Sequence, residues 1–133
     1  MIVVDTNILA YASIQGGATA GALAVKRQDA DWVAPPLWRS ELRQVLAREI
    51  RFRGMSVVEA LTAFKEAEAL VVEPDFAIDT TEVLILAGST GCSAYDCEFV
   101  ALAQELGVLL VTGDRRLAAR FPAVAIHLEK FVS

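Results

Sequence analysis

The chain has 133 residues, of which 55% are hydrophobic, and a net charge of −5 from 17 acidic and 12 basic residues. This length predicts one domain over residues 1–133, and the hydrophobic content excludes a disordered chain. No apolar run approaches the roughly 20 residues that span a bilayer, and the start lacks the pattern of a signal peptide, so we expect a cytoplasmic protein.

Apolar runs typical of strands alternate with helical patterns along the chain. This alternation predicts an α/β fold with a central, mainly parallel sheet. The expected strands are 2–4, 32–34, 71–72, 108–111 and 124–126. The expected helices are 6–13, 18–28, 36–52, 57–70, 79–87, 94–106 and a short segment between Asp114 and Pro122. The spacing of Ser56 and Glu59 predicts a capping box at the start of one of these helices.

The uneven distribution of charge keeps a nucleic-acid partner possible despite the negative total. Five arginines occur between residues 39 and 53, against two glutamates, which gives a local charge of +3. Ten acids and no base occur between residues 66 and 114. A positive stretch suits phosphate binding, although a solvated helix face explains the arginines equally well.

Two aspartates follow apolar strands. Asp5 comes directly after the strand 2–4, and Asp114 follows the strand 108–111 by three residues. Ligands of open parallel sheets bind outside the carboxyl ends of the strands, which is where both acids would lie. Each also suits an ordinary helix N-cap, so both explanations stay open.

Asp96 lies in the first turn of a helix whose apolar stripe contains Tyr95, Phe99, Leu102 and Leu106. Its own face continues with apolar residues, whereas Glu98 and Glu105 mark the expected wet side of the helix. Asp96 is therefore expected to point into a largely buried region, unless it only completes a capping box with Ser93. A buried carboxylate needs a partner, and a metal ion is a strong one.

Glu41 borders the apolar stripe of the helix 36–52 and provides a fourth acid on a separate element. Four carboxylates brought together repel each other unless cations lie between them. Oxygen ligands suit Mg²⁺ or Mn²⁺ rather than zinc, and such sites commonly serve phosphoryl chemistry.

Other enzyme classes lack their motifs in this sequence. The dinucleotide-binding and P-loop glycine patterns are absent, as is the nucleophile elbow. The single histidine, His127, makes a Ser-His-Asp triad improbable and is interpreted as structural. Cys92 and Cys97 are too few for a disulfide scaffold or a four-ligand zinc site, and no histidine near them would activate a thiolate.

Four short motifs, in order, resemble those of the PIN-domain ribonucleases. They are D-T-N at 5–7, S-E at 40–41, Y-D-C-E-F-V-A-L-A at 95–103, and T-G-D at 112–114 with Leu117. The compact form is similar to the VapC-type toxins of toxin–antitoxin pairs. Many members place the last acid later in the fourth motif; here that later position is Leu117, so Asp114 must serve.

The resemblance implies a three-layer α/β/α fold and a Mg²⁺- or Mn²⁺-dependent endoribonuclease. Metal-activated water would leave a 5′-phosphate and a 3′-hydroxyl. It also implies a homodimer and a small VapB-type antitoxin as partners. By position, the metal-binding and catalytic acids would be Asp5, Glu41, Asp96 and Asp114, and the polar groups that orient water or ligand would be Thr6, Asn7 and Thr112.

Candidate RNA contacts and two other functions complete the sequence-based expectations. Arg39 and Arg43 share a helix face and are candidates for gripping the RNA backbone. Tyr11, Trp32 and Trp38 are candidates for stacking on bases, with core roles favoured for the tryptophans. The alternatives are a non-catalytic RNA-binding or assembly module on the same fold and, less favoured, a metal-dependent phosphatase or a receiver domain.

Overall fold

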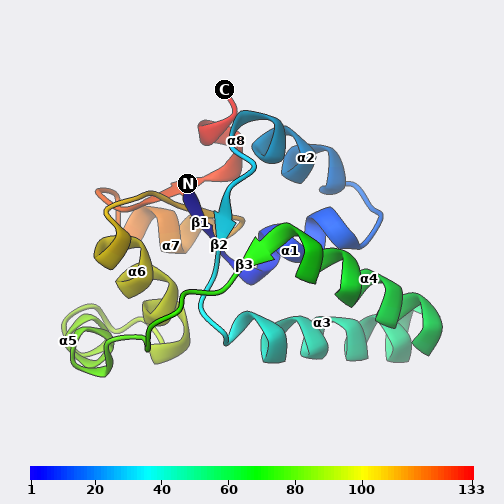
Figure 1. Cartoon of the computed structure of the whole chain (residues 1–133), viewed down its shortest axis with the longest axis horizontal. Helices are drawn as coiled ribbons and strands as arrows, with labels where there is room; N and C mark the ends of the chain where they lie inside the picture. Colours follow the sequence, from blue (N-terminus) through cyan, green and yellow to red (C-terminus); the bar gives the residue numbers. More distant parts are fainter.

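Five short strands form one parallel sheet in the computed structural model, which describes residues 1–133 (Figure 1). Their order across the sheet is β3-β2-β1-β4-β5, and every neighbouring pair is parallel. The predicted α/β fold is confirmed. The strands are β1 (Ile2–Val4), β2 (Trp32–Val33), β3 (Val71–Val72), β4 (Leu110–Thr112) and β5 (Ala125–His127).

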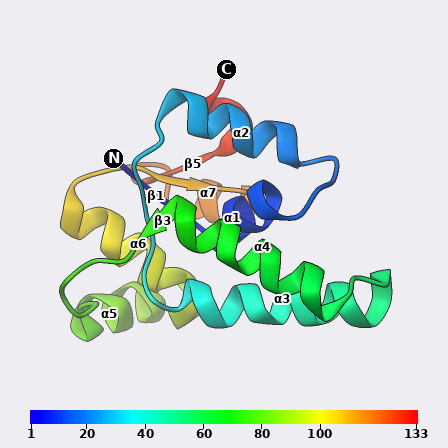
Figure 2. The same cartoon turned by 45° about the vertical axis from the view of Figure 1, so that its right-hand side comes forward.

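Helices cover both faces of this sheet and make three layers. The helices are α1 (Thr6–Ser13), α2 (Thr19–Gln28), α3 (Trp38–Arg53), α4 (Val57–Leu70), α5 (Thr80–Thr90), α6 (Ala94–Leu106), α7 (Arg115–Arg120) and α8 (Leu128–Phe131). In Figure 1, α1 to α4 lie on one side of the sheet and α5 to α7 on the other, and Figure 2 shows α3 and α4 packed side by side. Right-handed crossovers place the two sets of helices on opposite faces of the sheet. The reason is that the chain crosses the sheet in one direction from β1 to β3 and in the other direction from β4 to β5.

The core lies between these layers. Val3, Val4, Leu110 and Val111 have no exposed surface, as expected for parallel strands covered on both faces. Trp32 and Trp38 are also fully buried, which confirms their core roles. No helix of the structure has the length and apolar character needed to cross a membrane.

Several element boundaries differ from the sequence-based expectation. The strand expected at 108–111 begins only at Leu110, because the N–H of Val108 still donates to the carbonyl of Ala103 and closes α6. The last strand is shifted by one residue, to 125–127, and α5 continues to Thr90. The short helix α8 was not predicted, and its N-cap is His127, whose ring nitrogen accepts from the N–H of Glu129.

The local signals for helix ends were more accurate. Ser56 and Glu59 form the predicted capping box at the start of α4. One side chain of the α6 stripe is misassigned: Tyr95 is 63% exposed, whereas Phe99 and Leu102 are buried. The first turn of α6 therefore presents Tyr95 to solvent.

Strands β1 and β4 are neighbours at the point where the direction of chain crossing reverses. In open parallel sheets such a point leaves a crevice beyond the carboxyl ends of the two strands. The residues that follow β1 and β4 are therefore brought together although more than a hundred residues separate them in the sequence.

Candidate active site

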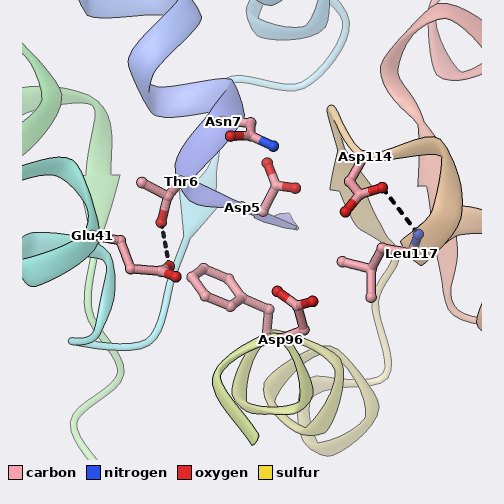
Figure 3. Close-up of a pocket in the computed structure, with 8 residues that line it drawn as sticks. Asp5, Thr6, Asn7, Glu41, Asp96, Asp114 and Leu117 are labelled. Carbon is pink, nitrogen blue, oxygen red and sulfur yellow. Dashed lines mark hydrogen bonds between the residues drawn. The ribbon is translucent and has the colours of Figure 1, made fainter. Parts of the chain in front are cut away.

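A small open pocket lies at this carboxyl edge of the sheet (Figure 3). Its lining comes from four separate segments of the chain, and it includes all four acids singled out in the sequence. The lining residues are Asp5, Thr6, Asn7, Glu41, Asp96, Phe99, Asp114 and Leu117. The predicted convergence of the four acids in one pocket is thus observed.

Asp5 is the most deeply buried of the four acids, with 7% of its surface exposed. One carboxylate oxygen caps α1 by accepting from the N–H of Ile8 at 3.1 Å, and the other accepts from the hydroxyl of Thr112. Burial, together with the charge of the nearby Asp114 carboxylate, raises the pKa of Asp5 to about 6, even though the hydrogen bonds from Thr112, Ile8 and Gly113 act in the opposite direction.

Asp114 enters the pocket from the loop that follows the neighbouring strand β4, and it caps α7. Its Oδ1 accepts from the N–H of Arg116 at 2.8 Å and from that of Leu117 at 3.4 Å. Its own N–H donates to the Thr112 hydroxyl at 2.9 Å. The N-cap explanation is therefore confirmed for Asp5 and Asp114, and their place in the pocket keeps the ligand-binding explanation open as well.

Glu41 approaches from the first turn of α3 and is held by a neighbour of Asp5. The hydroxyl of Thr6 donates to Oε1 of Glu41 at 2.7 Å (Figure 3). Partial burial raises the pKa of Glu41, as does the negative charge of Asp96, while the Thr6 hydrogen bond lowers it.

Asp96 points towards the pocket from the first turn of α6 (Figure 3). Ser93 caps the helix by accepting from the N–H of Asp96 at 3.1 Å, and no reciprocal bond from the Asp96 side chain completes a capping box. The carboxylate is half-buried, which raises its pKa, and the charge of Asp114 raises it again. Capping alone therefore does not account for this side chain.

These carboxylates repel one another, and no basic residue lines the pocket to offset them. The pKa values of Asp5, Glu41 and Asp96 are each raised first by burial and then by another acid of the pocket. A divalent cation relieves such repulsion, and a purely oxygen donor set suits Mg²⁺ or Mn²⁺. No three acidic, histidine or cysteine side chains form a ready-made cage. The fit to a cation therefore rests on donor chemistry and on the shared pocket.

Two features of the surroundings were not expected from the sequence. Glu98, assigned to the wet side of α6, is only partly exposed, and its pKa is raised by burial and by the charge of Glu41. Tyr11 lies against Gly113: a Cβ atom placed on that glycine would be 2.7 Å from Cε2 of Tyr11. Neither position has a local sequence signal, because both depend on how α1, α3 and α6 meet the sheet.

Arg39 and Arg43 do not line the acidic pocket. The Arg39 guanidinium binds Glu73 at 2.5 Å and Glu68 at 2.7 Å and lies over the ring of Trp38. Arg43 lies over the ring of Phe64, at the apolar groove between α3 and α4. The sequence proposed both arginines for gripping the RNA backbone, whereas the structure directs the head group of Arg39 to two glutamates.

Comparisons with known proteins agree with the fold and the motifs. A family model described as PIN domain matches residues 2–122. Ribonuclease VapC3 from Pyrobaculum aerophilum is 35% identical over 92 residues, which cover 69% of this chain and 66% of that protein. The alignment thus spans slightly less than two thirds of the relative.

Solved structures with the same fold were also found. The crystal structure of PAE2754 from Pyrobaculum aerophilum matches with a TM-score of 0.75 at 22% identity, over 98% of this chain and 85% of that one. A structure of FitAB bound to an IR36 DNA fragment matches with a TM-score of 0.59 at 15% identity, over 96% of this chain and 95% of that one. At these identities the likeness concerns the fold.

Proposed function

The chain belongs to the PIN-domain family, and we propose that it is a metal-dependent endoribonuclease that acts as the toxin of a toxin–antitoxin pair. The observation that carries the proposal is the shared pocket of Asp5, Glu41, Asp96 and Asp114, which contains no compensating cationic side chain. The similarity to a relative named Ribonuclease VapC3 supports RNA as the substrate, and the resemblance of the four motifs to the VapC-type toxins supports the toxin role.

The four acids would hold Mg²⁺ or Mn²⁺. When bound there, such an ion activates water for in-line attack on a phosphodiester and offsets the charge that develops on the phosphate. Thr112 holds the carboxylate of Asp5, and Thr6 holds that of Glu41, so both ligands are oriented before any ion arrives. Asn7 lines the same pocket and offers an amide to water or substrate. The expected products carry a 5′-phosphate and a 3′-hydroxyl.

The catalytic proposal is tested by RNA cleavage with chelator-treated protein to which Mg²⁺ or Mn²⁺ is returned. We expect Asp96→Asn to abolish cleavage, whereas Glu105→Gln, an exposed acid on the same helix, keeps it. Sequencing of the cleaved ends identifies the chemistry of the cut. Cleavage that needs no added ion, or that survives Asp96→Asn, would contradict the proposal.

The same proposal includes a homodimer, a cytoplasmic location and a small VapB-type antitoxin as partner. We expect induced expression of the chain to arrest growth of a bacterial host, and the Asp96→Asn variant to be harmless at equal protein level. Light scattering of the purified protein measures its oligomeric state. If the variant arrested growth as strongly as the wild type, the toxicity would not depend on the acidic pocket, and the proposal would be contradicted.

A further inference from the structure

Tyr11 packs against Gly113 next to the acidic pocket, although it is neither one of the lining residues nor one of the residues that carry the family motifs. It lies one helical turn after Asn7, so both side chains project from the same face of α1. A Cβ atom on Gly113 would lie 2.7 Å from Cε2 of Tyr11, 2.9 Å from its hydroxyl and 3.0 Å from Cβ of Asn7. The phenol thus occupies the space directly above the backbone that joins Thr112 to Asp114.

The hydroxyl of Tyr11 is available to a ligand. The structure contains no hydrogen bond from it, and the nearby Asp5 does not need it, because both Asp5 oxygens already accept bonds from Ile8 and Thr112. A tyrosine hydroxyl is protonated at neutral pH, so it can donate a hydrogen bond.

A phosphate that approaches this pocket meets four carboxylates and no lysine or arginine in the lining. A lysine or arginine placed there would form an ion pair with the carboxylates. A neutral hydrogen-bond donor does not, so it stays free to hold a phosphate oxygen. The neutral donors on this side are the Asn7 amide and the Tyr11 hydroxyl. The two arginines expected to grip the backbone are directed to other partners.

We propose that Tyr11 is a substrate-binding residue whose hydroxyl donates a hydrogen bond to a phosphate oxygen of the RNA strand beside Asp5 and Asp114. This inference rests on the proposed ribonuclease function and adds a contact that the four acids do not provide. A neutral donor contributes affinity without releasing counterions, so its removal should weaken RNA binding equally at every salt concentration.

The test compares Tyr11→Phe with Tyr95→Phe. The first keeps the ring over Gly113 and removes only the hydroxyl; the second makes the same change at the chain's other tyrosine, which is 63% exposed. Binding of a short RNA is titrated at several salt concentrations in the Asp96→Asn background, and KM and kcat are measured in the active protein. We expect Tyr11→Phe to weaken binding about tenfold or more and to raise KM correspondingly. The slope of affinity against salt and the thermal melt should stay unchanged.

The outcomes separate the two proposals. Wild-type cleavage together with equal RNA affinity for Tyr11→Phe and Tyr95→Phe would overturn the role of Tyr11 and leave the ribonuclease intact. If the wild-type protein did not cleave RNA, the proposed ribonuclease function would be overturned. The RNA-binding titration of Tyr11→Phe against Tyr95→Phe would still decide whether Tyr11 contacts RNA. A protein that neither binds nor cleaves RNA would overturn both.

Discussion

The hydroxyl of Thr112 donates a hydrogen bond to Oδ2 of Asp5 across 107 residues of sequence. The same hydroxyl accepts from the N–H of Asp114 at 2.9 Å. One side chain therefore fixes two of the pocket's acids, at the ends of the two central strands. Thr112 has no exposed surface, so water cannot replace either bond.

Replacing Thr112 by valine should damage both stability and the pocket. Thr112→Val leaves one oxygen of buried Asp5 and the N–H of Asp114 without a partner, which should cost about 1–3 kcal/mol in the free energy of unfolding. Loss of the bond should also raise the pKa of Asp5. Thr112→Ser keeps the hydroxyl and should retain most of the activity. Urea unfolding and RNA cleavage measure the two effects, and a fully active, fully stable valine variant would contradict the assignment.

The raised pKa of Asp5 predicts a pH-dependent stability in the absence of metal. In the unfolded chain the acid ionises near its ordinary value of 3.8, and in the folded protein only near 6. Between these values the folded state holds a proton that the unfolded state has released. Stability should therefore fall as pH rises from 4 towards 7, by at most about 3 kcal/mol for a shift of roughly two pKa units.

Asp5→Asn removes this titration and provides the matched comparison. Its side chain can still accept from Ile8, so the cap of α1 is retained. In chelator, unfolding at pH 4 and pH 7 should show the wild type losing more stability than the variant. Added Mg²⁺ should restore stability to the wild type at pH 7, because an ion that binds only the folded state stabilises it. Parallel pH curves for the two proteins would contradict the prediction.

Gly113 has no room for a side chain. Gly113→Ala would place a methyl group against the Tyr11 ring and Cβ of Asn7, and such crowding typically costs about 1–3 kcal/mol. At Gly88, in the last turn of α5, nothing lies within 4 Å, and Gly88→Ala should stabilise the protein by at most about 0.5–1 kcal/mol. Thermal melts distinguish the two. If the Gly113 cost persists after Tyr11→Ala, crowding by the ring is not its cause.

Arg39 is expected to contribute to stability more than to RNA binding, because its guanidinium is held by Glu68 and Glu73. Arg39→Ala should lower the free energy of unfolding by less than about 1 kcal/mol, since the side chain is 36% exposed. The salt dependence of RNA binding should match that of Arg48→Ala, which removes an equal charge from an exposed position of α3. If the slope of log affinity against log salt concentration were smaller by about 0.7 for Arg39→Ala than for Arg48→Ala, the phosphate contact of Arg39 inferred from sequence would be supported.

Much of this protein is determined by local sequence patterns. The apolar run 2–4, the capping box of Ser56 and Glu59, and the glycine after α6 each predict an element or an end, because they act through neighbouring residues. The four acids also stand out locally, since carboxylates at strand ends and on half-buried helix faces conflict with simple burial. Fold class and the acidic pocket could therefore be predicted.

Side-chain partners across elements could not be predicted in this way. Arg39 and Asp96 both lie in first turns of helices, yet one side chain is directed to Glu73 and the other into the pocket. Likewise, nothing near Tyr11 in the sequence indicates that its ring lies on Gly113. The sequence by itself determined most of the elements, although not the short helix α8, and it determined which acids are available. Only the tertiary structure decided what each long side chain touches, because those contacts join residues brought together by the strand order of the sheet.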